Sequence, residues 1–291
     1  MGKQLGIGKT LAQMAATLAV FACVFLMNAR FQSAAVQTVA EQETAVRLPV
    51  IMYHSILKDQ ARAGRYVLSP DALAADLDYL KAQGYETVSI AQLVDYVDGA
   101  GTLPEKPVLL TFDDGQYNNY LYAYPLLKER GMCAVVSVIG AETVRYTETG
   151  QENAYWSYLS AERLREMQES GVFEIENHSY DLHENAGRKG CLKRRGEDDA
   201  AYRALLTEDT ERAQEMLVNA GLPAPLCYAY PYGACSRETE EVLRGLGFRC
   251  TLGCAEKENL ITRDPDCLYL LGRYNRPSGV STEAFFGKAL A

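Results

Sequence analysis

Two adjacent aspartates, Asp113 and Asp114, directly follow the apolar run VLLTF at residues 108–112. Burying a carboxylate costs free energy and neighbouring negative charges repel each other, so such a pair needs compensation. The chain has three histidines: His54, His178 and His183. Two imidazoles and one carboxylate suit a divalent metal, with zinc favoured, and leave one position open for water. The charge of that cation would keep the second aspartate ionised beside the first, which explains why both are present.

These residue types predict the hydrolysis of a carbonyl compound. A bound metal lowers the pKa of water to about 7, and an ionised aspartate can accept the proton that the water releases. The hydroxide then attacks the carbonyl, while the metal and a backbone N–H stabilise the oxyanion. A leaving amine needs a proton, and His54 is the histidine that remains to donate it.

Each of these motifs alone has a simpler explanation. Asp-Asp-Gly after a strand is often only a turn or a helix cap. Two histidines five residues apart do not share a regular helix face, and a lone histidine usually packs in a core or on a surface. The case for catalysis depends on their joint placement, because the aspartate pair and every histidine lie just past a predicted strand.

The elements that must position these residues alternate along the chain. Apolar runs typical of strands occur at residues 48–53, 108–112, 133–139, 172–176, 226–230, 248–252 and 268–272. Amphipathic stretches typical of helices occur at residues 70–83, 89–98, 117–130, 160–170, 202–220 and 236–246. This alternation predicts an α/β domain with a parallel sheet inside and helices outside, closed or nearly closed into a barrel. The charged segment 184–200 lacks periodicity and is predicted to be a solvated loop.

In parallel sheets the chemistry occurs at the carboxyl ends of the strands. The residues that follow the predicted strands form the candidate site: His54, Asp113, Asp114, His178 with His183, Tyr232 and Arg273. We expect these side chains to converge, although they come from distant parts of the chain.

The N-terminal region differs from the rest in composition. Lys3 and Lys9 precede LAQMAATLAVFACVFLMN at residues 11–28, an apolar run near the lower length limit for a membrane-spanning helix. The positive charges before it predict that the rest of the chain lies outside the membrane. A cleaved signal peptide, which would release the protein, is the alternative. The predicted organisation is a cytoplasmic segment 1–10, an anchor or signal segment 11–28, a linker 29–46 and a single catalytic domain 47–291.

The composition restricts the partners and the cysteine chemistry. The net charge of −9 and the pI near 5.0 argue against nucleic acid, because its phosphates require a basic surface. Of the 8 cysteines, Cys23 lies in the apolar N-terminal run and the others follow it. Their odd number leaves at least one unpaired in a monomer, and an outside location permits one or two disulfides without requiring them.

Three motifs in fixed order resemble those of the polysaccharide deacetylase family, also called the NodB homology domain or carbohydrate esterase family 4. They are TFDDG at 111–115, HSYDLH at 178–183 and YAYPYG at 228–233. The opening LPVIMYHSI at 48–56 resembles the branch of poly-β-1,6-N-acetylglucosamine deacetylases. The resemblance spans roughly residues 47–280. It implies a distorted (β/α)7-type barrel and metal-dependent removal of N-acetyl groups from a glycan.

The resemblance also implies a role for each motif residue. Asp113 corresponds to the catalytic base, and the metal ligands correspond to Asp114, His178 and His183. Tyr232 lies where the proline-tyrosine turn of the family offers its backbone N–H to the oxyanion.

Two departures from the family pattern affect the remaining roles. Many members have an arginine shortly before the proline-tyrosine turn that tethers the base, but residues 228–230 are Tyr-Ala-Tyr here. Arg273 is the expected replacement. Many members also end with a leucine-x-histidine motif that supplies the general acid, and no histidine follows His183 in this chain. The resemblance to the biofilm branch assigns that role to His54.

These observations predict a metal-dependent polysaccharide N-deacetylase, with Zn²⁺ as the expected cofactor and a polysaccharide containing N-acetylglucosamine as the substrate. A poly-N-acetylglucosamine exopolysaccharide and peptidoglycan both remain open. The expected location is the cell membrane with the catalytic domain outside, or secretion if the N-terminal segment is cleaved. The alternatives are an O-acetyl esterase that uses the same attack, or a catalytically silent glycan-binding module on the same fold. Asp113 argues against the silent module, because binding alone would not need a base.

Overall fold

The computed structural model describes residues 27, 45–183 and 187–291, and residues 46–291 form one compact unit. Apart from Met27, the predicted segment 11–28 lies outside the described residues, as does the predicted linker 29–46 except for Ala45 and Val46. Among the residues that are described, no helix is long and apolar enough to cross a membrane.

The centre of the domain is an eight-stranded sheet in which all neighbouring strands run parallel. Seven strands follow one another across it: β10 (Cys250–Leu252), β9 (Cys227–Ala229), β8 (Phe173–Asn177), β7 (Ala134–Val138), β6 (Pro107–Phe112), β2 (Val50–Tyr53) and β12 (Tyr274–Asn275). The short strand β5 (Glu86–Thr87) pairs with the beginning of β6. A single parallel bridge from Leu252 to Leu271 connects the edge at β10 with the segment that leads into β12. The sheet is therefore a curled parallel sheet, and the predicted α/β class is confirmed.

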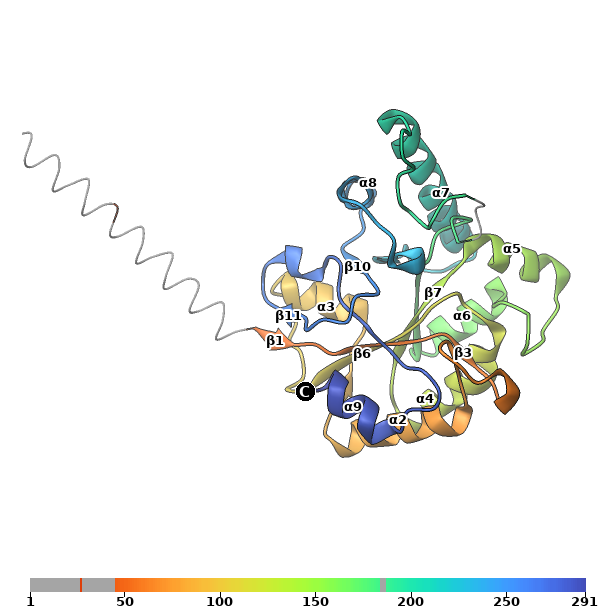
Figure 1. Cartoon of the computed structure of the whole chain (residues 1–291), viewed down its shortest axis with the longest axis vertical. Helices are drawn as coiled ribbons and strands as arrows, with labels where there is room; N and C mark the ends of the chain where they lie inside the picture. Colours follow the sequence, from red (N-terminus) through yellow and green to blue (C-terminus); the bar gives the residue numbers. More distant parts are fainter. Residues whose placement is uncertain (1–26, 28–44, 184–186) are drawn as a thin grey trace, which may run out of the picture. The chain divides into compact units, whose positions relative to one another are not determined.

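Helices surround this sheet (Figure 1). They are α2 (Pro70–Ala82), α3 (Ile90–Val97), α4 (Tyr124–Arg130), α5 (Gly140–Thr149), α6 (Ala161–Glu169), α7 (Asp199–Asn219), α8 (Arg237–Gly245) and α9 (Thr282–Ala289). Serine side chains accept hydrogen bonds from the first turns of α2, α3, α6, α8 and α9, which satisfies backbone donors that the helix leaves unpaired. Because helices cover both faces, all residues of β2, β6 and β7 are buried, as expected for a parallel sheet.

Shorter elements complete the frame of the site. Strand β1 (Val46–Arg47) pairs antiparallel with β11 (Leu260–Ile261), and β3 (Ser55–Ile56) pairs parallel with β4 (Val67–Leu68). A π-helical turn, η2 (Asn119–Ala123), leads into α4. Three 3₁₀ turns occur at η1 (Gln60–Arg62), η3 (Pro231–Gly233) and η4 (Pro265–Leu268).

The predicted strand at 268–272 is wrong. Its beginning belongs to η4, Leu270 has a positive φ of 56°, and the last strand, β12, begins only at Tyr274. The Asn259 side chain exchanges hydrogen bonds with both backbone groups of Gly272, at 2.7 and 2.9 Å. Leu271 thus keeps a single bridge to β10, while an amide side chain binds the backbone of the next residue, Gly272.

Two further features differ from the sequence expectations, whereas the cysteines stay within them. Helix α5 was not predicted, because its N-cap position is an isoleucine without a capping side chain and several β-branched residues lower its helix propensity. The described part of segment 184–200 is not simply solvated, since Arg188 and Cys191 are buried. In the described chain, all seven cysteines from Cys133 to Cys267 are free thiols.

Candidate functional site

The turn after β6 places the two aspartates in different surroundings. Asp114 and Gly115 both have left-handed backbone conformations, with φ of 71° and 75°. Such a conformation costs free energy in a non-glycine residue and often marks a functional turn. A Cβ atom on Gly115 would lie 2.7 Å from Cγ1 of Val138, so only glycine fits between β6 and β7. The turn thereby directs consecutive carboxylates toward separate partners.

Asp113 forms a buried ion pair with Arg273. The guanidinium is fully buried and donates two hydrogen bonds to the carboxylate, at 2.7 and 2.8 Å. Its third contact, from Nε to the Gly253 carbonyl at 2.7 Å, fixes its orientation. Burial alone would raise the pKa of Asp113, but Arg273 holds that pKa well below its usual range. The Asp113 carboxylate is therefore ionised throughout the neutral pH range.

Asp114, His178 and His183 form a cluster of potential metal ligands. Oδ1 of Asp114 lies 3.6 Å from Nε2 of His178 and 3.4 Å from Nε2 of His183. One ligand atom from each residue lies within 4.8 Å of the other two. Among the described residues this Asp114 oxygen has no hydrogen-bond partner although it is buried, and burial raises the pKa of Asp114 to about 6.

The donor set fits a divalent cation. Nδ1 of His178 lies 2.8 Å from the Ala229 carbonyl, so it donates there and leaves Nε2 as the lone-pair nitrogen that faces Asp114. Burial also lowers the pKa of His178, which favours the neutral form that a ligand requires. The unpartnered oxygen of Asp114 gains a partner if a cation is bound. Asp114, His178 and His183 would hold it, and two imidazoles with one carboxylate match the donors of catalytic zinc.

The turn between the two histidines is held from a helix. Asp209 of α7 accepts hydrogen bonds from the backbone N–H groups of Tyr180 and Asp181, at 2.9 and 2.8 Å. Ser179, next to His178, has a positive φ of 73°. Sequence analysis did not identify Asp209, because a carboxylate within an amphipathic helix normally faces solvent.

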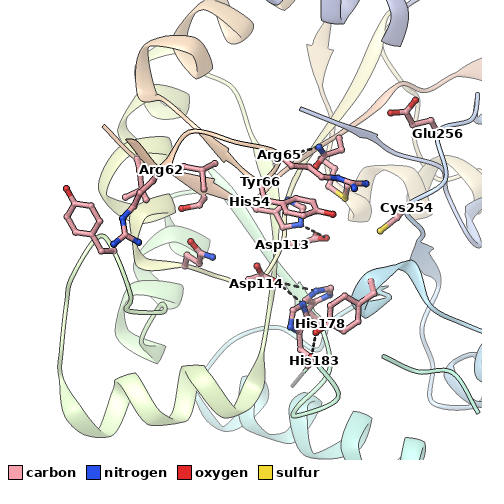
Figure 2. A pocket seen from close by; sticks show the side chains of 18 of the residues that line it. His54, Arg62, Arg65, Tyr66, Asp113, Asp114, His178, His183, Cys254 and Glu256 are labelled. Atoms are coloured by element: carbon pink, nitrogen blue, oxygen red, sulfur yellow. Dashed lines mark hydrogen bonds and ion pairs between the residues drawn. The ribbon is translucent and has the colours of Figure 1, made fainter. Parts of the chain in front are cut away.

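His54 lies on the opposite side of Asp113 from the metal ligands (Figure 2). Its Nε2 is 4.0 Å from Oδ2 of Asp113, and its ring is 4.6 Å from the ring of Tyr66. Nδ1 is buried without a hydrogen-bond partner in the described part of the chain. Burial lowers the pKa of His54, and the negative charge of Asp113 opposes that effect.

Tyr232 closes the other side of the cluster. Its φ of 60° lies in the left-handed region, and its ring stacks on that of His183 at 4.6 Å. Its hydroxyl donates to the His183 carbonyl, which joins the turn after β9 to the turn after β8. The side chain stays 52% exposed, so it is accessible from the cleft.

One cleft of about 900 Å³ brings the predicted residues together. His54, Asp113, Asp114, His178, His183 and Tyr232 line it, and Arg273 lies behind Asp113. Sequence analysis missed other lining residues: Arg62, Arg65, Tyr66, Tyr155, Lys189, Cys254 and Glu256. They come from loops without a motif, and only their charged or aromatic character distinguishes them.

Comparison with known proteins assigns the family. The sequence profile described as Polysaccharide deacetylase matches residues 100–251, which is more than half of the chain. The poly-beta-1,6-N-acetyl-D-glucosamine N-deacetylase of Escherichia coli K12 is 28% identical over 218 residues, which cover 68% of this chain. The aligned part spans only 32% of that relative's length.

Solved structures agree with this assignment. IcaB from Ammonifex degensii is 30% identical with a TM-score of 0.68, and the match covers 85% of this chain and 97% of that one. A de-N-acetylase from Aggregatibacter actinomycetemcomitans is 27% identical with a TM-score of 0.67, covering 81% of this chain and 96% of that one. The protein belongs to the polysaccharide deacetylase family. The predictions of the family and of a deacetylase enzyme are confirmed.

Proposed function

We propose that this protein is a metal-dependent hydrolase that removes N-acetyl groups from a polysaccharide containing N-acetylglucosamine. The observation that supports it most is the placement of Asp114, His178 and His183 beside an aspartate that Arg273 keeps ionised. The relatives with the same fold are named as N-deacetylases, and two of them match at 27–28% identity. An N-acetyl group on a glucosamine polymer is therefore the proposed target.

The chemistry divides between the two aspartates. A divalent cation held by Asp114 and the two histidines would activate water and polarise the carbonyl of the acetyl group. Asp113 accepts a proton in our proposal. Arg273 keeps the Asp113 carboxylate ionised in the neutral pH range and fixes its orientation through two hydrogen bonds.

The leaving amine requires a proton, and the group that donates it should lie on the side of Asp113 that faces away from the metal ligands. His54 is the proposed donor, because its Nε2 lies 4.0 Å from Asp113 and its ring lines the cleft. Tyr232 is proposed to stabilise the developing oxyanion through its backbone N–H, as the turn after β9 places it next to His183.

The proposed location is the outer side of the cytoplasmic membrane. Its support is the pattern of Lys3, Lys9 and the apolar run at 11–28, which is typical of an anchor or a signal segment. An active site outside the membrane would meet an exopolysaccharide or peptidoglycan directly. Protease accessibility of the domain on intact cells would test the location.

Acetate release from defined glycans tests the function. The full-length protein is incubated with β-1,6-linked N-acetylglucosamine oligomers, β-1,4-linked oligomers or peptidoglycan, with added Zn²⁺ or with a chelator. We expect release that depends on the metal and that Asp113→Asn lowers by at least about 100-fold. Metal binding by Asp113→Asn, measured by competition with a chromogenic chelator, should persist because Asp113 is not a proposed ligand.

The comparison of substrates also separates the alternatives. Release from an O-acetylated glycan but from none of the three amides would identify an esterase instead. Full activity of His54→Ala would exclude His54 as the acid, and full activity of the chelated enzyme would exclude the metal.

A further inference from the structure

Three cationic side chains line the cleft without a role in the proposed chemistry: Arg62, Arg65 and Lys189. All three are exposed. Arg62 has an acidic neighbour, Asp59 at 3.9 Å, and lies over the ring of Tyr155 at 5.2 Å. Within the described ranges, neither Arg65 nor Lys189 has a carboxylate at ion-pair distance. These two cations are notable in a chain whose net charge is −9.

The acidic groups of the cleft do not neutralise them. Asp113 is paired with Arg273, and Asp114 belongs to the candidate metal site. Glu256 also lines the cleft, but its carboxylate pairs with Lys288. Among the described residues, none of these acidic side chains lies at ion-pair distance from Arg65 or Lys189.

Arg65 is held next to His54. Its backbone carbonyl accepts a hydrogen bond from the Asn275 side chain at 2.9 Å, and the carbonyl of Tyr66 accepts one from the Ser55 backbone at 3.0 Å. The Arg65 guanidinium lies over the Tyr66 ring at 5.2 Å, and that ring contacts His54 (Figure 2). The backbone that carries Arg65 is therefore held in place, and the Tyr66 ring keeps its exposed guanidinium near His54.

Lys189 is held on the part of the cleft that Tyr232 and His183 form. A Cβ atom on the next residue, Gly190, would lie 2.4 Å from the Pro231 carbonyl, so the loop packs directly against the turn that carries Tyr232. Arg65 and Lys189 consequently lie near different parts of the cleft, one beside the proposed acid and one next to the turn that carries Tyr232.

We propose that the cleft takes an N-acetylated glycan with anionic substituents, carboxylate or phosphate, on sugars next to the one that is deacetylated. This inference rests on the proposed function and specifies its substrate. Guanidinium and ammonium groups bind such anions through charge-assisted hydrogen bonds, which are stronger than those that the neutral oxygen atoms of an unsubstituted glycan accept.

The test compares three β-1,6-linked N-acetylglucosamine oligomers of equal length: unsubstituted, O-succinylated and O-phosphorylated. The measured quantity is kcat/KM for acetate release by the full-length, Zn²⁺-loaded protein. We expect a preference of about tenfold for at least one anionic oligomer at low ionic strength, as two exposed ion pairs would produce. The preference should shrink in about 1 M salt, because salt screens exposed charges. The succinyl and phosphoryl oligomers distinguish the two anion types.

A matched pair of double variants assigns the preference to these cations. Arg65→Gln/Lys189→Gln removes both from the cleft. Lys58→Gln/Arg195→Gln removes the same charge from exposed positions in the same two loop regions, outside the cleft lining. The ratio of anionic to neutral kcat/KM should fall to about one in the first variant and stay at the native value in the second.

The outcomes are distinguishable. Equal kcat/KM on neutral and anionic oligomers, or a preference that survives Arg65→Gln/Lys189→Gln, would overturn this inference while release from the neutral oligomer upholds the proposed function. No release from any oligomer would overturn both.

Discussion

At the scale of single residues, the site shows how surroundings make two identical side chains different. Asp113 and Asp114 are adjacent and buried, yet Arg273 lowers the pKa of the first while burial raises the pKa of the second to about 6. One carboxylate therefore carries its charge with a fixed partner inside the protein. The other is harder to ionise, and a cation bound beside it would stabilise its charge, as expected for the proposed metal ligand.

Replacing Arg273 tests this arrangement. In Arg273→Gln the buried Asp113 loses its compensating charge, so its pKa should rise. Because the proposed base must be ionised, the acidic limb of the kcat/KM profile should move to higher pH. The loss of a buried pair should also lower the free energy of unfolding by about 3–5 kcal/mol. A pH–rate profile and urea unfolding measure both effects.

A second buried pair provides the control. Arg276 makes two hydrogen bonds to Asp76, at 2.8 and 3.0 Å, away from the cleft lining. Arg276→Gln should cause a comparable loss of stability but leave the acidic limb in place. An equal shift of the limb in both variants would contradict the role assigned to Arg273.

At the scale of elements, the turns that follow the strands hold most of the non-glycine residues with an unfavourable backbone conformation. Among the described residues, four non-glycine residues have positive φ: Asp114, Ser179, Tyr232 and Leu270. The first three lie in the turns after β6, β8 and β9, which all contribute to the site. The cost of these conformations, about 1–3 kcal/mol each, must be offset by the packing of the strands behind them.

Gly115→Ala should disrupt the first of these turns. Its positive φ disfavours alanine, and the new Cβ would meet Val138 at 2.7 Å. Gly84 has the same φ of 75° but open space around its Cβ position, so Gly84→Ala isolates the conformational cost. We expect Gly115→Ala to lose about 1–3 kcal/mol more than Gly84→Ala in urea unfolding and to bind Zn²⁺ more weakly. If both variants lose the same free energy of unfolding, β7 moves to accommodate the added methyl group and the predicted clash is wrong.

Asp209→Ala should loosen the turn between the two histidines. Two backbone N–H groups would lose their acceptor, so the histidines would be less well oriented for a metal. We expect Zn²⁺ affinity to fall about 10–100-fold, as for other residues that orient metal ligands. Competition with a chelator measures it, and Glu208→Ala, at the exposed neighbouring position, serves as the control. If Asp209→Ala binds Zn²⁺ with the native affinity, Asp209 stabilises the fold but does not orient the histidines.

At the scale of the whole molecule, the parallel sheet brings the site residues together and also buries an acidic side chain that has no role in the site. It brings His54, the two aspartates and the two histidines to one cleft, with Arg273 behind Asp113, while β8 carries Glu176 into the interior. Burial raises the pKa of Glu176 well above its ordinary value, and its carboxyl oxygen accepts the Cys227 N–H at 2.7 Å. The folded state thus holds a proton there that the unfolded chain releases.

This burial makes stability depend on pH. The unfolded pKa of a glutamate is about 4.3, so between that value and the raised native pKa the folded state binds more protons. The free energy of unfolding therefore falls as the pH rises through that window. Glu176→Gln, which stays neutral, should gain stability relative to the native chain between about pH 5 and pH 8. Thermal unfolding at both pH values measures it. Glu169→Gln, at an exposed position, should show no such trend.

The sequence by itself determined the class of fold and the residue types of the site. Strand and helix periodicity predicted most elements, and polar residues after apolar runs identified the aspartates and histidines, because parallel strands end at a common face. The same logic failed at 268–272, where Leu271 makes a single bridge to β10 and the Asn259 side chain binds the backbone of Gly272. An apolar run predicts that its side chains are buried. Buried residues need not form the continuous backbone hydrogen bonds of a strand.

Only the tertiary structure decided which partner each residue has. The contact between Asp113 and Arg273 spans 160 positions, and the expectation that Arg273 tethers the base came from the family resemblance and not from a local pattern. No local pattern identified Asp209 behind the histidine turn, or Arg65 and Lys189 at the rim of the cleft. Hydrogen bonds, burial and charge compensation depend on distances between segments that are remote in the chain, and these exist only once the sheet has brought the segments together.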